Sequence, residues 1–319
     1  MSEDDLIARH FAPLAGEGGL GLLDDAACIA SIPGHDLVIT CDALVAGVHF
    51  FADDPADAVA AKALRVNLSD LAAKGATPRG FVLALALPKH DEAWLASFAR
   101  GLKRDIEAFA FPLLGGDTVK TPGPLMVSVT AFGSVPQGRM VPRTGACAGD
   151  ALYVTGTIGD ATLGLLERQG QISAGQGGAH LVARYLMPEP RNALAPALLE
   201  FAHAAMDVSD GLVGDLTKMM RVSGVSAEVM LADVPLSAGA RSVVIMDEAL
   251  FTRAMTGGDD YEILASIPQE KAQAFEAAAA ALGVVVTRIG EVRAGTEAPA
   301  FLLADGRALN VVGGAYSHF

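Results

Sequence analysis

Residues 55–75, PADAVAAKALRVNLSDLAAKG, combine a helical pattern with an acidic side chain on an apolar face. At 100° per residue, Asp70 projects among small and branched apolar residues, and leucines cover the other flank of the same helix. Burying a charge without a partner is costly, so buried carboxylates are paired, protonated or bound to metal. Lys74 is the cation within helical reach of Asp70. An ion pair and a metal ligand therefore both remain open for this carboxylate.

Strands and helices alternate around this helix. Residues 37–41 (LVITC) form an apolar, β-branched run that predicts a buried strand, and Asp42 follows directly. Lys74-Gly75, followed by Pro78, predicts the end of the helix. The other elements expected in the first half are a strand over 80–88, a helix over 92–109 and two strands ending near residues 116 and 135.

The segment 136–150 is rich in Pro, Gly and Arg, which predicts a domain boundary. We place the two domains at 1–137 and 138–319. Residues 151–155 predict a strand with which the alternation of strands and helices resumes, and a helix over 160–168 follows. The predicted fold class is α/β (α+β), with two domains of roughly equal size.

Composition and charge limit the classes of function. Of the 319 residues, 51% are hydrophobic and 19% are charged, which allows a large core and argues against extended disorder. The net charge of −14 repels a nucleic-acid backbone, and it would repel nucleotides unless cations lie between. Taken alone, the charge also fits a role in solubility.

Location and cysteine chemistry follow from what the sequence lacks. The first residues, MSEDDL, have no signal-peptide pattern, and no apolar run approaches the roughly 18 residues needed to cross a bilayer. Cys28, Cys41 and Cys147 form no CxxC pair, and the seven histidines form no HExxH motif. We therefore predict neither a disulfide framework nor a zinc cluster, and we expect a cytoplasmic protein with no membrane or nucleic-acid partner.

Several acidic motifs lie at expected strand ends and helix starts. They are Asp24-Asp25, Asp42, Gly115-Gly116-Asp117, Asp207-Val-Ser209-Asp210 and Gly257-Gly258-Asp259-Asp260-Tyr-Glu262. Each motif alone fits helix capping or an ordinary turn. Glycine pairs also let backbone N–H groups approach a phosphate, and a neighbouring acid can hold the cation. As a set they are typical of Mg²⁺ sites, because Mg²⁺ prefers oxygen ligands and bridges protein to substrate phosphate.

The common nucleotide-binding motifs do not account for this chain. Residues 16–21 (GEGGLG) match G-x-G-x-x-G only in letters, since they follow an amphipathic helix pattern rather than a strand, and we predict a flexible loop there. The sequence has neither a P-loop nor the HRD and DFG motifs of protein kinases. If ATP binds, it therefore binds to a fold other than those of the Rossmann, P-loop and protein-kinase families.

In order along the chain, these motifs resemble those of the thiamine-monophosphate kinases, a family of the aminoimidazole-ribonucleotide-synthetase-like superfamily. The resemblance rests on DDAA (24–27), TCDALVAGVHF (40–50), KALRVNLSDLAAKGA (62–76), GGDT (115–118), RTGA (143–146), DVSDGL (207–212), GGDDYE (257–262) and GAYSHF (314–319). It implies ATP-dependent conversion of thiamine monophosphate to thiamine diphosphate. It also implies a homodimer whose N-terminal sheets pack together, with active sites along a groove between domains.

The resemblance implies roles for individual residues. Mg²⁺ ions would be held by Asp25, Thr40, Cys41, Asp42, Asp70, Asp117, Asp207 and Asp210. ATP would be contacted by Gly116, Asp117, Arg143 and Ser209, and thiamine monophosphate by His49, Glu262 and Tyr316. The chain departs from the family pattern at Leu23, where Gly is usual, and at Cys41, where Thr is usual. Only the backbone oxygen of Cys41 could serve Mg²⁺, because a thiol suits a hard cation poorly.

The expected chemistry needs no side-chain base. A phosphate monoester has a second pKa of about 6, so the attacking oxygen is already largely ionised at pH 7. We expect direct in-line transfer of the γ-phosphoryl group, without a phospho-enzyme. The alternatives are another ATP-using member of the superfamily, of the selenophosphate or aminoimidazole ribonucleotide synthetase type, and a non-catalytic nucleotide or Mg²⁺ sensor. The glycine loop at 16–21 contains no Cys or Lys and the chain does not end in Cys, which argues against selenium handling and hydrogenase maturation.

Overall fold

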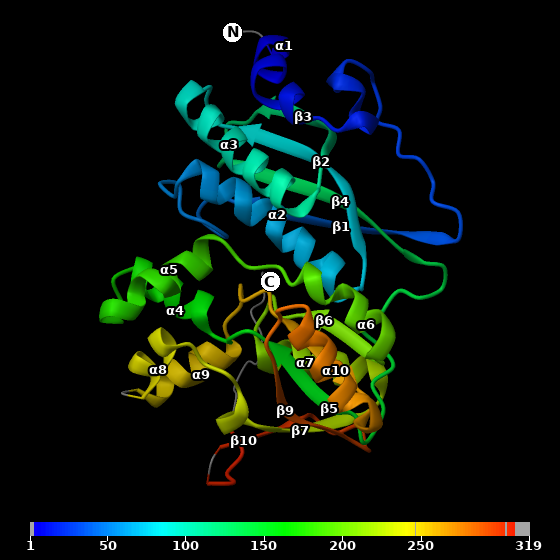
Figure 1. Ribbon diagram of the computed structural model, residues 1–319. Helices are drawn as coiled ribbons and strands as arrows, with labels where there is room; N and C mark the ends of the chain where they lie inside the picture. The colour runs from blue at the N-terminus through cyan, green and yellow to red at the C-terminus, as the bar shows by residue number, and fades with distance from the viewer. Residues whose placement is uncertain (1–2, 246, 304, 310–319) are drawn as a thin grey trace. The chain divides into compact units, whose positions relative to one another are not determined.

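The computed structural model describes residues 3–245, 247–303 and 305–309 (Figure 1). The chain divides into two compact units, one of residues 1–71 and 76–140 and the other of residues 72–75 and 141–319. Each unit is built on its own sheet, four-stranded in the first and six-stranded in the second, so the predicted mixed α/β class is confirmed. Among the described residues, no helix has both the length and the apolar character that a membrane crossing requires.

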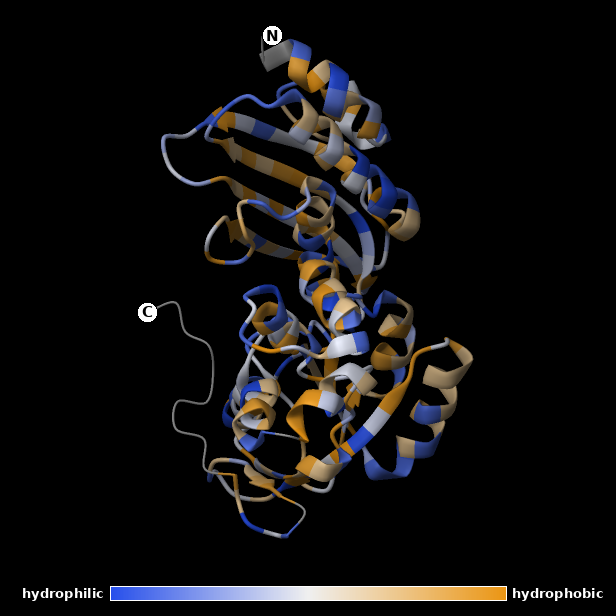
Figure 2. Cartoon of the chain, turned by 90° about the vertical axis from the view of Figure 1, so that its left-hand side faces the viewer, coloured by the Kyte–Doolittle hydropathy of each residue, from blue (hydrophilic) through white to orange (hydrophobic). Residues whose placement is uncertain are grey.

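The first unit is a sheet with its two long helices on one face (Figure 2). Its elements are α1 Glu3–Leu6, η1 Ile7–Phe11, η2 Ala12–Leu14, η3 Glu17–Leu22, β1 His35–Val45, α2 Ala56–Ala73, β2 Thr77–Leu87, α3 Glu92–Phe109, β3 Leu113–Lys120 and β4 Met126–Pro136. The strand order is β1-β4-β2-β3, in which β2 and β3 are parallel and the other neighbours are antiparallel. Strands β1 and β3 are therefore the two edges of the sheet.

The face of this sheet opposite α2 and α3 presents apolar side chains to solvent. Leu37 and Ile39 on β1 are 56% and 57% exposed, and Val119 on β3 is 49% exposed. Val38, between the two β1 residues, is 7% exposed, because successive side chains of a strand point to opposite faces. Exposed apolar residues on one sheet face, here on both edge strands, are typical of a surface that binds another protein surface.

The glycine-rich segment at residues 16–21, expected to be a flexible loop, packs against β3 instead. Most of it lies in η3, where Leu20 and Gly21 have positive φ angles of 51° and 69°. The Gly16 N–H donates to the Leu113 carbonyl at 2.8 Å. A Cβ added at Gly19 would lie 2.8 Å from the Leu114 carbonyl oxygen. These glycines therefore permit a close backbone approach to the edge strand.

The second unit is a sheet enclosed by helices on both faces. Its elements are β5 Ala151–Thr155, α4 Asp160–Arg168, η4 Gly175–Gly177, α5 Gly178–Leu186, η5 Asn192–Leu194, α6 Ala195–Phe201, β6 Ala204–Asp207, α7 Leu212–Ser223, β7 Ser226–Met230, η6 Leu231–Asp233, α8 Ala238–Val244, α9 Glu248–Thr256, β8 Ile263–Ile267, η7 Gln269–Lys271, α10 Ala272–Ala281, β9 Val286–Arg293 and β10 Ala300–Leu302. The strand order is β10-β7-β9-β5-β8-β6.

Strand β5 shows how this sheet separates two apolar cores. All five of its residues are buried. Leu152 and Val154 belong to the core that α4, α5 and α7 to α9 cover, whereas Ala151 and Tyr153 belong to the core that α6 and α10 cover. A strand buried on both faces reads as a continuous apolar run rather than an alternating one, as residues 151–155 do.

A buried ion pair joins α2 to α3 in the first unit and generates a stability prediction. Arg65 donates from Nε and Nη2 to the two carboxylate oxygens of Asp105 at 2.7 and 3.0 Å, and the Asp105 side chain is fully buried. We expect Asp105→Ala to lower the free energy of unfolding by about 3–5 kcal/mol, because it leaves a guanidinium without its partner. Urea unfolding followed by the fluorescence of Trp94, the single tryptophan, reports on this unit.

The matched control is Glu107→Ala on the same helix, where the carboxylate is 67% exposed and pairs loosely with Lys103 at 3.9 Å. We expect little change in its unfolding midpoint, because surface ion pairs contribute little to stability. Equal midpoints for the two variants would contradict the assignment of Asp105 as a structural ion-pair partner.

Candidate active site

In the first unit, the predicted residues Thr40, Asp42 and Asp70 meet Asn67 between β1 and α2. Thr40 Oγ1 donates to Asp70 Oδ2 at 2.5 Å. The backbone N–H of Asp42 donates to Asn67 Oδ1 at 3.2 Å, and Asn67 Nδ2 donates to the Ala63 carbonyl at 3.0 Å. Thr40 and Asp42 are two residues apart on a strand, so both side chains face the helix. This group offers oxygen ligands only.

Cys41 lies between these two residues, and its thiol is on the other face of the sheet. Thr130 Oγ1 donates to Cys41 Sγ at 3.3 Å, and Ser128 Oγ lies 3.7 Å from the same sulfur. A thiol held there cannot reach an ion at Asp42 and Asp70. The backbone carbonyl is the part of Cys41 that could act as a ligand at that group.

His49 sits in a turn just after β1. The Val45 N–H donates to His49 Nδ1 at 3.0 Å, and the His49 N–H donates to the Val45 carbonyl at 2.9 Å. Lys62 Nζ donates to the His49 carbonyl at 3.0 Å. Because Nδ1 accepts a hydrogen bond, the neutral ring carries its proton on Nε2.

A second group of predicted residues lines a cavity of about 240 Å³ at the β3 edge of the sheet. Asp24 and Asp25 come from the loop after η3, and Gly115, Gly116 and Asp117 come from β3. Two carboxylates at 24–25 and a third at 117 therefore share one cavity with a glycine pair. That combination can take a phosphate together with its cation.

The two acidic groups of this unit are well separated. Strand register places Asp42, Val129, Leu83 and Gly116 in one row across the sheet. At about 4.8 Å per strand, three steps separate the edge strands by roughly 14 Å. Asp117, one residue beyond Gly116, points to the opposite face of the sheet from Asp42. A single copy of the first unit therefore presents two acidic groups that cannot share one ion.

In the second unit, the Asp207–Asp210 motif links the end of β6 to the start of α7. Asp207 is 5% exposed. The N–H groups of Ser209 and Asp210 donate to Asp215 Oδ2 at 3.0 and 2.8 Å. Lys218 forms ion pairs with Asp210 and with Asp215, the latter at 3.0 Å. The turn that carries the predicted ligands is thus held by a carboxylate and a lysine from the helix behind it.

Asp215 and Lys218 were not among the residues predicted from sequence. Burial raises the pKa of Asp215, although the hydrogen bonds from Asp210 N–H and Lys218 oppose this. Burial alone would lower the pKa of Lys218, but its bonds to Asp210 and Asp215 outweigh burial and raise it. The i, i+3 spacing of the two residues on α7 is the signal that could have revealed the pair.

The Gly-Gly-Asp-Asp segment lies directly against this turn. The Asp259 N–H donates to the Ser209 carbonyl at 2.9 Å, and the Tyr261 N–H donates to the Val208 carbonyl at 2.8 Å. Asp259 and Tyr261 have φ angles of 73° and 52°, which L-residues rarely adopt. A Cβ added at Gly258 would lie 2.2 Å from the Ser209 carbonyl oxygen. Strain of this kind concentrates at functional sites, where surrounding contacts maintain it.

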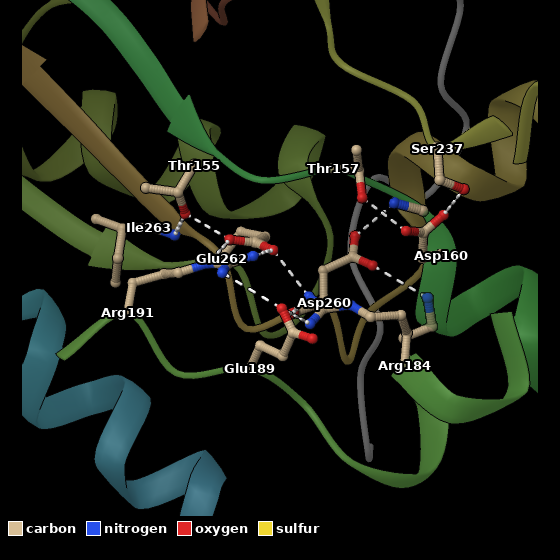
Figure 3. A network of polar contacts seen from close by, with 12 residues as sticks. Thr155, Thr157, Asp160, Arg184, Glu189, Arg191, Ser237, Asp260, Glu262 and Ile263 are labelled. Carbon is tan, nitrogen blue, oxygen red and sulfur yellow. Dashed lines mark hydrogen bonds and ion pairs between the residues drawn. The ribbon is translucent and has the colours of Figure 1, made fainter. Parts of the chain in front are cut away.

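Glu262, predicted to contact substrate, lies in a buried polar network (Figure 3). It accepts from Arg184 Nη2 at 2.8 Å, from Arg191 Nε and Nη2 at 2.6 and 2.5 Å, and from Thr155 Oγ1 at 2.5 Å. The Glu262 side chain is fully buried. A substrate contact by Glu262 would have to share its carboxylate with two guanidinium groups.

The neighbouring Asp260 carboxylate caps α4. It accepts from the N–H groups of Gly159 at 2.7 Å and Ala161 at 3.2 Å. Burial raises the pKa of Asp260 well above its usual range, against the effect of these two N–H bonds. Two further predicted residues complete the set: Arg143 is exposed on the loop before β5, and Tyr316 lies outside the described residues.

The two glycines at 115 and 116 provide a matched test of the β3 cavity. A Cβ at Gly116 would lie 2.0 Å from the Leu83 carbonyl oxygen of the neighbouring strand, whereas a Cβ at Gly115 would meet only Val82 Cγ1 at 3.8 Å. We expect Gly116→Ala to separate β3 from β2 and lower the melting temperature and nucleotide affinity, and Gly115→Ala to change neither. Thermal melts and fluorescent-nucleotide titration measure both effects. Equal behaviour of the two variants would contradict this register.

Comparison with known proteins gives the family. Residues 23–135 match the AIR synthase related protein N-terminal domain, and residues 148–300 match the corresponding C-terminal domain. The chain is 49% identical over 297 residues to the thiamine-monophosphate kinase of Caulobacter vibrioides, covering 91% of this chain and 84% of that relative.

Solved structures agree with this match. The crystal structure of thiamine-monophosphate kinase from Stenotrophomonas maltophilia K279a is similar at 37% identity and a TM-score of 0.84, with 96% of both chains covered. The structure of AaThiL complexed with AMPPCP and TMP is similar at 29% identity and a TM-score of 0.79, with 100% of this chain and 99% of that chain covered. The chain therefore belongs to the thiamine-monophosphate kinase family and contains both AIR synthase related domains.

Proposed function

We propose that this chain transfers the γ-phosphoryl group of ATP to thiamine monophosphate and so forms thiamine diphosphate. The observation that carries the proposal is its similarity, over the full chain, to a structure complexed with AMPPCP and TMP. The acidic motifs support it, because the oxygen-rich groups at β1–α2, at the β3 cavity and at the 207–210 turn suit phosphates that arrive with cations.

We propose Mg²⁺ as the cation, because the donor set fits it. The side chains concerned are carboxylates and one hydroxyl, and the Cys41 thiol is turned away. Residues that would hold the ions are Asp25, Thr40, Asp42, Asp70, Asp117, Asp207 and Asp210, with the Cys41 carbonyl. When bound, Mg²⁺ neutralises phosphate charge and aligns the two anions.

The protein's own residues then have positioning roles. The substrate phosphate is already ionised near neutral pH, so no side chain has to remove a proton. We propose that Arg143 and the N–H groups near Gly116 and Ser209 bind ATP phosphates, and that His49 donates from Nε2 to thiamine monophosphate. Glu262 and Tyr316 remain proposed contacts for the same substrate. Transfer is direct and leaves no phosphate on the protein.

Asp70→Asn tests the proposed metal role. Asparagine can still accept the Thr40 hydroxyl bond but lacks the charge that draws a divalent cation. We expect kcat to fall by about 100-fold or more, as when an electrostatic contact to developing charge is removed, with the circular dichroism spectrum unchanged. ADP release is measured with and without thiamine monophosphate across a Mg²⁺ titration.

Asp36→Asn is the control, since Asp36 is an exposed carboxylate on β1, the strand that carries Thr40, and it accepts the Gly138 N–H. We expect its turnover to stay close to that of the wild type. Near-normal turnover of Asp70→Asn at low Mg²⁺ would exclude the metal role. ADP release that is independent of thiamine monophosphate would exclude the kinase proposal itself.

We further propose that the chain forms a homodimer through the open face of the first unit's sheet. Leu37, Ile39 and Val119 supply an exposed apolar surface on that face. Asp117 points to the same face, so a two-fold partner would lie beside the β3 cavity.

Ile39→Asp tests the dimer. A charge placed in an apolar interface has to be desolvated, so we expect this variant to be monomeric at concentrations where the wild type is dimeric. Light scattering coupled to size-exclusion chromatography gives the mass. Val285→Asp, at an apolar residue of the second unit that is 70% exposed, should keep the wild-type mass. A monomeric wild type, or a dimeric Ile39→Asp, would contradict the proposed interface.

A further inference from the structure

Three metal-ligating side chains of different chemistry meet at one end of the six-stranded sheet. A sulfur of Cys147, a carboxylate oxygen of Asp150 and a ring nitrogen of His203 all lie within 4.8 Å of one another. Cys147 and His203 are exposed, whereas Asp150 is 4% exposed. None of the three belongs to the residues proposed to bind ATP, Mg²⁺ or thiamine monophosphate.

The backbone holds these three residues in place. The Cys147 N–H donates to Asp150 Oδ2 at 2.9 Å, and the Asp150 N–H donates to the Cys147 carbonyl at 3.0 Å, which closes a turn just before β5. The His203 N–H donates to the Ser266 carbonyl at 3.0 Å just before β6. Ser266 Oγ, on β8 between those strands, donates to Asp150 Oδ2 at 2.7 Å. Hydrogen bonds therefore orient the Asp150 carboxylate, as is usual for a metal-ligating carboxylate, and they fix the backbones of Cys147 and His203 beside it.

The Asp150 carboxylate and the His203 ring are close enough to share an ion. Asp150 Oδ2 accepts from Cys147 N–H and Ser266 Oγ, and His203 Nδ1 lies 3.0 Å from Oδ2 and 3.2 Å from Oδ1. Two ligands that each lie about 2.0 Å from a tetrahedral ion are about 3.3 Å apart. Both carboxylate oxygens thus lie close to a ligand-to-ligand distance from Nδ1, at contacts that are hydrogen bonds when no ion is bound. The exposed Cys147 thiol, which makes only a long bond to the Gly145 carbonyl at 3.4 Å, needs a side-chain rotation to complete the set.

We propose that Cys147, Asp150 and His203 bind one Zn²⁺ ion. Thiolate, imidazole and carboxylate are the three protein donors that Zn²⁺ takes, and three of them leave a fourth position for water or an external ligand. Mg²⁺ is disfavoured here, because a thiolate and an imidazole are poor ligands for a hard cation. On binding, the thiol releases its proton, and the His203 ring proton resides on Nε2 so that Nδ1 can coordinate.

The bound ion would cross-link two segments of the second unit. It would join the turn before β5 to the residue before β6, two strands that β8 separates. An ion that binds the folded chain and not the unfolded chain raises the melting temperature by mass action. The position on the sheet rim, with two exposed ligands, gives the ion access from solvent.

Cobalt substitution tests this site directly on the full, reduced chain. Co²⁺ is added in the presence of excess Mg²⁺, which saturates carboxylate-only sites, and absorption is recorded in the near-ultraviolet and visible. We expect a thiolate-to-Co²⁺ charge-transfer band at one ion per chain, and displacement of that band by Zn²⁺. Zn²⁺ should also raise the melting temperature.

Variants at the two exposed ligands identify the donors without disturbing buried Asp150. Cys147→Ser should abolish the charge-transfer band, and His203→Ala should weaken Co²⁺ binding by about 100-fold, of the order seen when a metal site loses a supporting group. Cys28→Ser and Cys41→Ser, at the other exposed cysteines, should keep the wild-type band and affinity. Circular dichroism checks that each variant is folded.

The outcomes decide the proposal independently of kinase activity, because no substrate is present. A wild type without a thiolate band would overturn it. A band that survives Cys147→Ser, or one that is lost in Cys41→Ser, would do the same by assigning the sulfur elsewhere. A band that depends on Cys147 and His203 and on neither of the other cysteines would establish the site.

Discussion

The second unit depends on satisfying buried carboxylates. Asp160, Asp260 and Glu262 are each at most 1% exposed. An unpaired charge at such positions would cost several kcal/mol. The donors come from distant segments: the first turn of α4 serves Asp260, and the guanidinium groups of Arg184 and Arg191 serve Glu262 (Figure 3). These bonds position α4, the segment 184–191 and the segment 259–263 that leads into β8 relative to one another.

The need to satisfy buried carboxylates gives the acidic residues of the segment 257–262 two different roles. Within residues 257–262, Asp260 and Glu262 are committed to the interior by the contacts that satisfy them. Asp259 instead sits in a left-handed turn against the 207–210 segment. A carboxyl whose pKa is higher in the folded state binds its proton more tightly there, so Asp260 favours folding more at low pH than at neutral pH. At neutral pH its contribution is to cap α4, through the N–H groups of Gly159 and Ala161.

Local elements of this chain could be predicted from the sequence because local signals specify them. The helix expected at 92–109 is α3, Glu92–Phe109, where the Asp91 side chain accepts the Trp94 N–H at the start and Ala110 adopts the left-handed conformation at the end. The strand at 151–155 and the helix at 160–168 coincide with β5 and α4. The prediction of a flexible loop at 16–21 was wrong, because this segment packs against β3, nearly a hundred residues away along the chain.

Site partners that lie far apart in sequence could not be predicted in this way. Spacing rules for zinc ligands rely on neighbours such as CxxC, whereas Cys147 and His203 are brought together by strand order. Strand β8 is antiparallel to both β5 and β6, so the end of β8 must lie beside the starts of the other two. Residues that precede β5 and β6 therefore converge on Ser266, whatever their separation along the chain. Ligand sets in a sheet protein are thus better sought among residues that flank neighbouring antiparallel strands than among residues close in sequence.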